Sequence, residues 1–236
     1  MSGEESEHPQ PAPPNWLALA WDDYVDNLPR LVPVLLFPVL LSFVTFYIID
    51  RWHSYVPALA YMAGVLTPLS LGVNLSFIRA VRREPGVIPA MFSAVPVYGR
   101  ALAVSFGLGA MTLAGTFLFI VPGAVLYSTY CFSEYVVVER RTGVGESFAF
   151  SSAITAGWRI PIFMLVLLLV IGELVVPNPV YVSGSLAAPA VKTDLRPWVL
   201  AAFLLKTFFY FPWVKLALAR AYVFLSSGSV AAPGPR

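Results

Sequence analysis

The sequence contains few charged residues, since Asp, Glu, Lys and Arg make up only 12% of its 236 residues. Soluble globular domains carry about 25% charged residues. So few charges cannot cover a water-soluble globule of this size, which excludes an ordinary cytosolic enzyme, and the high apolar content excludes a disordered chain. The net charge is only +2, and the sequence has no basic stripe, so nucleic acid is not expected as a partner.

Cysteine and histidine are almost absent. The single cysteine, Cys131, excludes an intrachain disulfide framework and a cysteine-based zinc site. The two histidines, His8 and His53, do not stand at a metal-ligand spacing from acidic residues. The sequence therefore predicts a protein without catalytic residues, a metal or a cofactor.

Apolar residues are correspondingly abundant, at 58% of the chain with 14% aromatic residues. They form continuous runs, and about 20 apolar residues suffice for a helix to cross the hydrocarbon core of a bilayer. Continuous runs favour helices over a transmembrane β-barrel, whose strands alternate. We predict an all-α, polytopic membrane protein with six transmembrane helices, over residues 31–49, 56–78, 101–120, 124–138, 160–176 and 198–225.

The third and fourth runs are separated by a turn signal at Pro122 and Gly123. One long kinked helix is an alternative, but the combined length of about two membrane thicknesses favours two helices.

Lysine and arginine are distributed unevenly between the predicted connections. The connections after the second and fourth spans are basic, and the opposite side carries only Arg51, Lys192 and Arg196. Because short cytoplasmic loops are enriched in basic residues, we expect both termini in the cytoplasm (N-in/C-in) and a multi-pass protein of the bacterial inner (cytoplasmic) membrane. The basic side contains Arg79, Arg82, Arg83, Arg100, Arg140, Arg141 and Arg159.

The two ends of the chain differ from its middle in composition. Residues 1–14 are polar and rich in proline, and we predict a disordered N-terminal tail, with a second tail over residues 226–236. A single transmembrane domain is expected over residues 15–225. The acidic residues 1–10 do not resemble a cleavable signal peptide, so the first span is expected to target the chain to the membrane.

Short, partly polar segments that end in arginine precede three of the predicted spans, over residues 15–30, 87–100 and 144–159. We interpret them as amphipathic helices at the cytoplasmic interface, where tryptophan and tyrosine favour the headgroup level and arginine reaches lipid phosphate. They either anchor and link the spans, or sense lipid packing or dock a soluble partner. The candidate interfacial residues are Trp16, Trp21, Arg30, Arg100, Trp158 and Arg159.

Four ionisable residues fall inside predicted spans, where charge is costly and often functional. Lys206 lies in the sixth span and Glu173 near the outer end of the fifth, so antiparallel packing can join them as an ion pair. Glu134 lies near the cytoplasmic end of the fourth span, with Lys215 as a candidate counter-charge. These residues either form structural ion pairs or extend their charged ends to the nearest interface. Alternatively, they form a polar pathway or a lipid-headgroup site.

The middle of the chain carries a pattern of an apolar run, a Pro-Gly turn, a helix ending in Glu139 and then a segment ending in Thr155-Ala156-Gly157-Trp158. This pattern resembles the YciC-like, DUF975-type bacterial membrane proteins and the membrane domain of some glycerophosphodiester phosphodiesterases. The resemblance implies a six-span membrane protein of poorly defined role. This sequence departs from the family pattern at residues 147–151, where Ser-Phe-Ala-Phe-Ser stands in place of the segment that usually contains basic residues.

These observations predict a non-enzymatic membrane protein that acts as an accessory, scaffold or membrane-organising subunit. Its expected partners are membrane lipids and another membrane protein complex, and the sequence does not identify a small-molecule ligand. The alternative is a transporter or lipid-handling protein with a polar pocket near Lys206, Glu173 and Glu134. A membrane enzyme acting on lipid is not favoured, because no acid–base pair is evident.

Overall fold

The computed structural model describes residues 14–118, 120–185 and 188–230. In this part of the chain, helices predominate and two short strands pair with each other, so the all-helical prediction is confirmed apart from the strands. The elements are α1 (Trp16–Trp52), α2 (Tyr55–Tyr61), the π-helical turn η1 (Met62–Leu66), α3 (Thr67–Val81), α4 (Val87–Ala90), the 3-10 turn η2 (Val95–Val97), α5 (Tyr98–Leu118), α6 (Ile120–Tyr130), α7 (Ser133–Arg140), α8 (Val144–Thr155), α9 (Arg159–Val175), β1 (Val180–Gly184), β2 (Pro189–Thr193), α10 (Pro197–Leu205), the π-helical turn η3 (Lys206–Tyr210) and α11 (Phe211–Val230).

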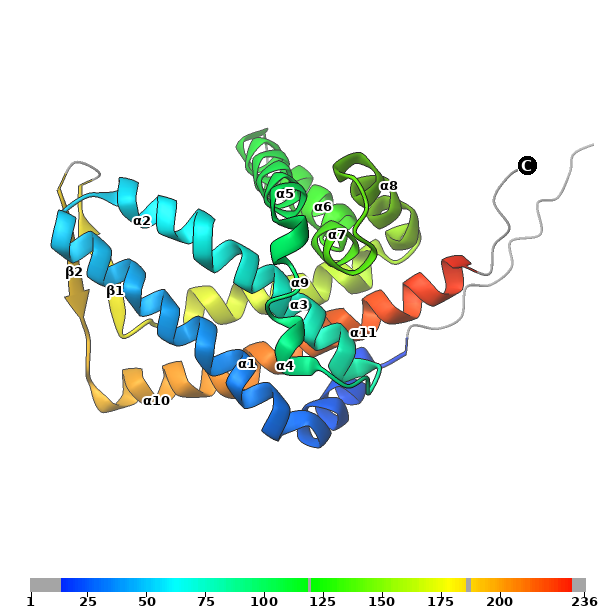
Figure 1. Cartoon of the computed structure of the whole chain (residues 1–236), viewed down its shortest axis with the longest axis horizontal. Coiled ribbons are helices and arrows are strands. Elements are labelled where there is room, and N and C mark those ends of the chain that lie inside the picture. Colours follow the sequence, from blue (N-terminus) through cyan, green and yellow to red (C-terminus); the bar gives the residue numbers. More distant parts are fainter. Residues whose placement is uncertain (1–13, 119, 186–187, 231–236) are drawn as a thin grey trace, which may run out of the picture.

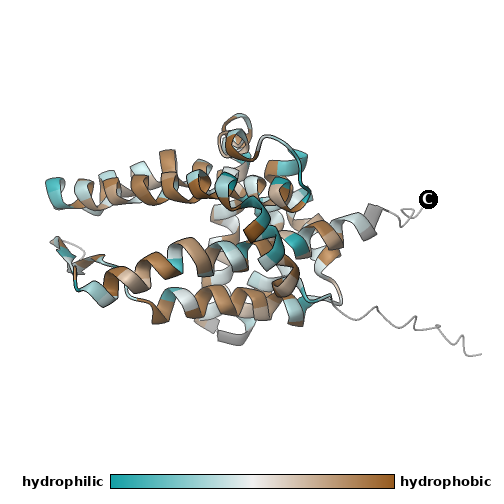
Figure 2. Cartoon of the chain, turned by 90° about the horizontal axis from the view of Figure 1, so that it is seen from below, coloured by the Kyte–Doolittle hydropathy of each residue, from teal (hydrophilic) through white to brown (hydrophobic). Residues whose placement is uncertain are grey.

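Four helical stretches are long and apolar enough to cross a membrane: Trp16–Trp52, Tyr55–Val81, Val87–Phe117 and Pro197–Ser227. Helices α8 and α9 add a fifth if they count as one span, although they meet at a bend of 110°. Figure 2 shows hydrophobic residues along most of the helices, with hydrophilic residues mainly at helix ends and connections. The described residues thus contain four or five candidate spans by length and composition, against the six predicted.

The predicted fourth span is not one continuous helix. Helix α6 ends at Tyr130 and α7 begins at Ser133. With 11 residues, α6 is about 17 Å long, roughly half of the hydrocarbon thickness. Carbonyl groups at a helix end need partners from elsewhere, and the hydroxyls of Ser151 and Thr155 donate to the Thr129 carbonyl at 3.0 and 3.1 Å. The break is therefore stabilised by another helix, α8.

Helices α5 and α6 are separate and pack against each other side by side, which confirms two helices rather than one kinked helix (Figure 1). Pro122 and Gly123, however, lie in the first turn of α6, after the turn that they were predicted to form. A Cβ atom on Gly123 would lie 2.2 Å from Thr116 Oγ1, so this glycine is needed for the close approach of the two helices.

The predicted interfacial segment and the first predicted span form one 37-residue helix, α1. Asn15 is its N-cap, because Asn15 Oδ1 accepts a hydrogen bond from the Ala18 amide at 3.2 Å. Pro29, Pro33 and Pro38 lie inside the helix, and each lacks the amide hydrogen that a continuous helix uses. The first, dark-blue part of α1 accordingly runs in a different direction from the remainder (Figure 1).

The start of α1 and the end of α11 lie on the same side of the molecule, opposite the β-hairpin (Figure 1). Helix α11 continues to Val230 and so includes residues 226–230 of the predicted C-terminal tail. The rest of the two predicted tails, residues 1–13 and 231–236, lies outside the described residues.

The β-hairpin of β1 and β2 lies in the connection between the fifth and sixth predicted spans, where no strand was predicted. The strands are antiparallel, with Val182 opposite Val191, and both contact α1. The hairpin follows α9 and precedes α10, and it lies at the end of the helices opposite the start of α1 and the end of α11 (Figure 1).

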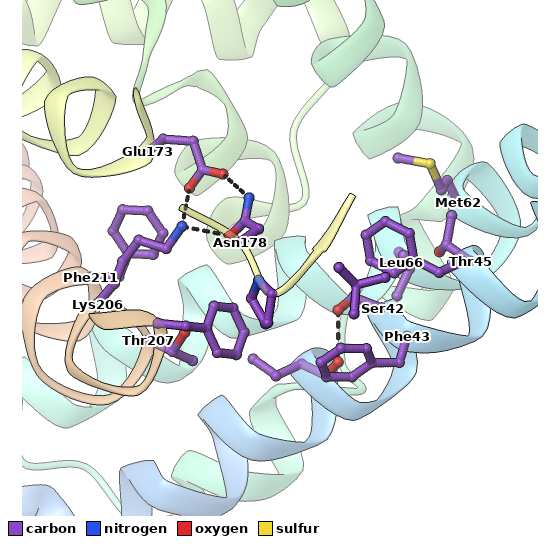
Figure 3. A pocket seen from close by; sticks show the side chains of 15 residues that line it. Ser42, Phe43, Thr45, Met62, Leu66, Glu173, Asn178, Lys206, Thr207 and Phe211 are labelled. Carbon is purple, nitrogen blue, oxygen red and sulfur yellow. Dashed lines mark hydrogen bonds and ion pairs between the residues drawn. The ribbon is translucent and has the colours of Figure 1, made fainter. Parts of the chain in front are cut away.

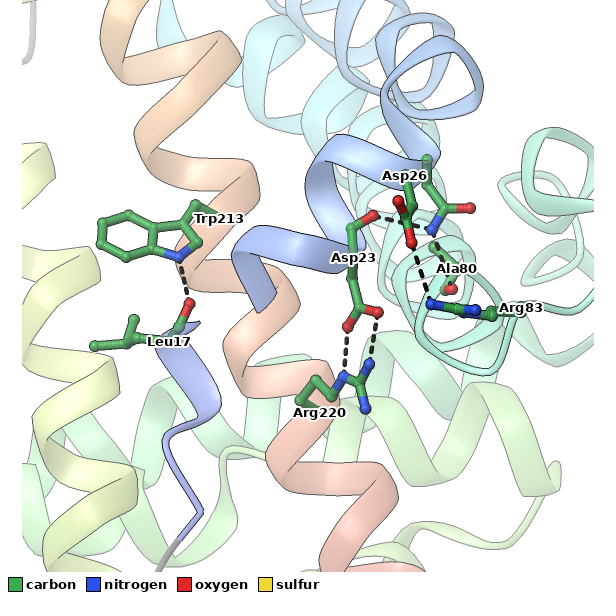
Figure 4. Close-up of polar contacts among 8 residues, drawn as sticks. Leu17, Asp23, Asp26, Ala80, Arg83, Trp213 and Arg220 are labelled. Carbon is green, nitrogen blue, oxygen red and sulfur yellow. Dashed lines mark hydrogen bonds and ion pairs between the residues drawn. The ribbon is translucent and has the colours of Figure 1, made fainter. Parts of the chain in front are cut away.

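The basic connections come together at the end of the molecule that carries the chain termini. Arg82 forms an ion pair with Glu139, which also accepts a hydrogen bond from the Tyr222 hydroxyl. Arg100 Nη1 donates to the Arg141 carbonyl at 2.9 Å. Figure 4 shows the neighbouring contacts that join α1 to α3 and to α11.

Candidate functional site

Lys206, the first residue of η3, is a buried charged residue inside the helical bundle. Its side chain is 2% exposed, and its ammonium donates to Asn178 Oδ1 at 2.7 Å and to the Val176 carbonyl at 3.2 Å. Glu173 Oε2 lies 3.5 Å from the same nitrogen (Figure 3). The predicted pairing of Glu173 with Lys206 is therefore present.

The end of α9 creates the acceptors for this ammonium. The last carbonyl groups of a helix lack intrahelical partners and carry a partial negative charge, which favours a cation. Val176 is the C-cap of α9, and its carbonyl points to Lys206 Nζ. The sequence Pro177-Asn178-Pro179 stops the helix and carries the Asn178 amide to the same point.

Glu173 differs from Lys206 in exposure. Its side chain is 53% exposed, and its Oε1 accepts a hydrogen bond from Asn178 Nδ2 at 3.3 Å. Asn178 thus contacts both members of the ion pair, one through its oxygen and the other through its nitrogen. The buried ammonium is compensated by a carboxylate that remains accessible.

An apolar cavity of about 340 Å³ adjoins this ion pair. Helix α1 contributes five of the 15 lining residues, more than any other element, and the two π-helical turns, η1 and η3, flank the cavity from other sides of the bundle. Such turns are rare and occur frequently at functional sites. The lining residues are Val39, Ser42, Phe43, Thr45, Phe46, Met62, Leu66, Glu173, Asn178, Pro179, Val180, Phe203, Lys206, Thr207 and Phe211.

The α1 wall of the cavity also contributes hydroxyl groups. Ser42 Oγ donates to the Val39 carbonyl at 2.7 Å. Thr45 Oγ1 is buried and has no hydrogen-bond partner among the residues that the structure describes. A buried polar atom without a partner is costly.

A second hollow of about 390 Å³ lies on another side of η3, and Lys206 borders both hollows. Its wall is almost entirely apolar and rich in aromatic rings. The lining residues are Trp21, Val176, Ala202, Leu205, Lys206, Phe209, Tyr210 and Trp213.

Glu134 and Lys215 lie apart from this site, which corrects the prediction of one pocket containing Lys206, Glu173 and Glu134. Glu134 Oε1 accepts a hydrogen bond from Ser105 Oγ at 2.7 Å, between α7 and α5. Within the described ranges Lys215 forms no ion pair, although the negative charge of Glu134 attracts it electrostatically. Glu134 lies in α7, after the break that follows α6, and its contact is with α5.

The candidate interfacial residues divide into two groups. Trp16 is only 5% exposed and packs against Trp158 at 5.8 Å and Phe224 at 6.3 Å between ring centroids, so it belongs to the protein core and is not a lipid anchor. Trp158 is half-buried in the same cluster. The exposed members, whose positions agree with an interface, are Trp21, Arg30, Arg100 and Arg159.

Sequence reasoning found the charged pair but missed the residues that complete the site. Asn178 stands between two prolines, which marked a turn but not a ligand of the ammonium. Met62 and Leu66 of η1 line the cavity, and their sequence carries no sign of a π-helical turn. In the described part of the chain, His, Cys, Asp and Glu form no group of three or more that could hold a metal ion.

No family model matches this sequence, and no curated protein or solved structure is significantly similar to it. The geometry around Lys206 is therefore the basis for assigning a function.

Proposed function

We propose that this chain is a non-enzymatic membrane protein that binds an amphiphilic, lipid-like molecule in the cavity beside Lys206. The observation that carries this proposal is a buried ammonium on the wall of an apolar cavity, between two π-helical turns. Ligand sites are typically mostly apolar with a few polar groups that fix orientation. An amphiphile has the matching composition, with a polar head for Lys206 and a chain for the apolar wall.

The location of the cavity supports a ligand that enters from the lipid. Its walls come from α1, α10 and the helix that contains η1, all of which belong to candidate spans. Pro179 and Val180, at the start of the β-hairpin, line the cavity at the outer end of the bundle. A lipid already dissolved in the bilayer reaches such a site without crossing water.

Ligand-dependent thermal stability tests this function. Oleate and monooleoylglycerol are expected to raise the unfolding temperature of the purified protein, since a ligand at about 100 times its Kd adds about 2.7 kcal/mol of stability. Thr45→Phe places a large ring in the cavity and should abolish the rise. Val44→Phe, on the exposed neighbouring face, should preserve it. The proposal is wrong if neither lipid stabilises the protein, or if both variants respond like the original chain.

We further propose six membrane-crossing segments with both termini in the cytoplasm of a bacterium, consistent with the resemblance to the YciC-like proteins. Two observations support this topology: the start of α1 and the end of α11 lie on one side of the molecule, and the basic connections contact each other there (Figure 1). An even number of crossings follows from such an arrangement, with α6 and α7 together returning the chain.

Cysteine labelling tests this topology. In a Cys131→Ser background, a membrane-impermeant maleimide added to intact cells should label Ser185→Cys, between β1 and β2, and leave Glu84→Cys unlabelled until the cells are opened. Labelling of Glu84→Cys alone in intact cells would reverse the orientation, and labelling of both would contradict the topology.

An accessory or scaffold role is the second candidate, and one exposed helix face supports it. Phe106, Leu113 and Phe117 lie on one side of α5 and are 78%, 59% and 84% exposed. Such a face contacts either lipid or another membrane protein. Gentle extraction followed by mass spectrometry should then recover a second membrane protein with the chain, and Phe106→Ala with Phe117→Ala should release it. Recovery of a monomer without a partner would count against this role.

A further inference from the structure

The ammonium of Lys206 makes two close contacts and one long one. The two close acceptors, Asn178 Oδ1 and the Val176 carbonyl, are neutral and lie at 2.7 and 3.2 Å. The only carboxylate near the ammonium among the described residues, Glu173 Oε2, lies at 3.5 Å. Charge-assisted N–H···O bonds are ordinarily about 2.7–2.9 Å long, so the charged partner is the loosest of the three.

The two charged groups also differ in how freely they can move away. Lys206 is enclosed, with the rings of Phe203 and Phe211 at 5.9 and 5.6 Å from its nitrogen, whereas about half of the Glu173 side chain is exposed. An unpaired charge is costly for the buried lysine and much less so for the exposed glutamate. Glu173 can therefore leave, provided that another anion takes its place.

We propose that the ligand is a monoanionic amphiphile, and that its carboxylate or phosphate group replaces Glu173 at Lys206 Nζ. This inference rests on the proposed lipid binding and names the headgroup. The exchange preserves the charge balance, because one anion leaves the ammonium as another arrives. The acyl chain lies along the apolar α1 wall, where Phe43 and Phe46 are placed to contact it. A neutral amphiphile can place its chain in the cavity but cannot replace the Glu173 carboxylate at Lys206 Nζ.

Competition between the ligand and Glu173 makes a specific prediction for Glu173→Gln. The variant loses the internal competitor and keeps a side chain of similar size and hydrogen-bonding capacity. Its affinity for oleate should rise about tenfold, equivalent to about 1.4 kcal/mol. Its affinity for monooleoylglycerol, which carries the same chain without a charge, should stay within about twofold. Both affinities are measured by titration of the full chain in a neutral detergent.

Lys206→Met is the opposite test, because it removes the ammonium that holds the anionic headgroup. Its affinity for oleate should fall at least about tenfold. Lys192→Met is the matched control, because Lys192 lies in β2 and does not line the cavity. If Lys206→Met fails to fold, the double variant Lys206→Met/Glu173→Gln removes both charges and keeps the test available: it should bind oleate no more tightly than monooleoylglycerol.

The outcomes separate this inference from the proposed function. Equal binding of oleate and monooleoylglycerol, unchanged in Glu173→Gln, overturns the anion exchange and leaves lipid binding intact. Absence of binding by either overturns both. A comparison of oleate with oleoyl lysophosphatidylglycerol, whose phosphodiester carries one negative charge, identifies the headgroup, and the anion whose affinity rises in Glu173→Gln is the one that the site accepts.

Discussion

Asp23 of α1 and Arg220 of α11 form a two-pronged ion pair, although 197 residues separate them in the chain. The guanidinium donates through Nη2 to Oδ1 at 2.6 Å and through Nε to Oδ2. Asn27 extends the contact to α3, since its Nδ2 donates to the Asp23 carbonyl at 2.9 Å and to the Ala80 carbonyl at 3.4 Å (Figure 4). The pair thus fixes the first and last helices to each other where both chain ends lie.

Removal of the charge of Asp23 should therefore destabilise the protein strongly. The Asp23 side chain is 1% exposed and that of Arg220 is 30% exposed, so the cost should lie at or below the value of about 3–5 kcal/mol that loss of one partner of a fully buried pair causes. Asp23→Asn should lower the unfolding temperature in detergent by on the order of 10 °C. Asp26→Asn is the control, because Asp26 and Arg83 form an exposed pair worth about 0–1 kcal/mol. Equal effects of the two substitutions would contradict this account.

The contact between α3 and α4 depends on a glycine. A Cβ atom on Gly72 would lie 1.8 Å from the Met91 carbonyl oxygen, so the backbone would have to move to accept Gly72→Ala. We expect a destabilisation of about 1–3 kcal/mol, typical of overpacking. Gly109→Ala is the matched control in α5, where no atom lies within 4 Å of the added Cβ, and it should be neutral or stabilising by up to about 1 kcal/mol. Thermal unfolding of both variants checks the prediction, which fails if Gly72→Ala is the more stable.

The break between α6 and α7 should depend on the hydroxyls of α8. The double variant Ser151→Ala/Thr155→Val removes both donors to the buried Thr129 carbonyl, and an unsatisfied group of this kind costs about 1–3 kcal/mol. Amide hydrogen exchange at residues 129–133 should become faster than in the original protein. Ser152→Ala, which leaves these donors in place, should not change the exchange. Unchanged exchange in the double variant would show that the break does not need α8.

The connection from β2 to α10 provides a pH-dependent contact outside the spans. Hydrogen bonds from Arg196, including Nε to Asp194 Oδ1 at 2.8 Å, lower the pKa of the Asp194 carboxyl below its ordinary value. A carboxyl whose pKa is lowered by folding stabilises the fold above its unfolded pKa, and this contribution is lost as the pH falls through the folded pKa. Arg196→Gln should raise the pKa of Asp194 toward the ordinary value in a carboxyl NMR titration. An identical titration curve would contradict the assignment of the cause.

Several features of the fold followed from local sequence. The apolar runs predicted most of the long helices, because apolar length is a property of neighbouring residues. Two separate helices, α5 and α6, were predicted from the combined length of their runs and a Pro-Gly signal, although Pro122 and Gly123 lie within α6. The pairing of Lys206 with Glu173 was predicted from two costly charges in antiparallel segments.

Tertiary structure decided the rest, since the groups responsible lie far apart in the chain. The sequence by itself determined that this chain is apolar enough to form membrane-crossing helices, that connections rich in arginine alternate with connections that contain few basic residues, and that Lys206 needs a partner. Only the folded chain decided that α8 would stabilise a break in the predicted fourth span, that Glu134 would turn toward Ser105, and that Asn178 and two π-helical turns would surround Lys206. Hydropathy indicates whether each segment favours water or lipid. The features decided by the fold depend instead on hydrogen bonds and packing between segments that come into contact only after folding.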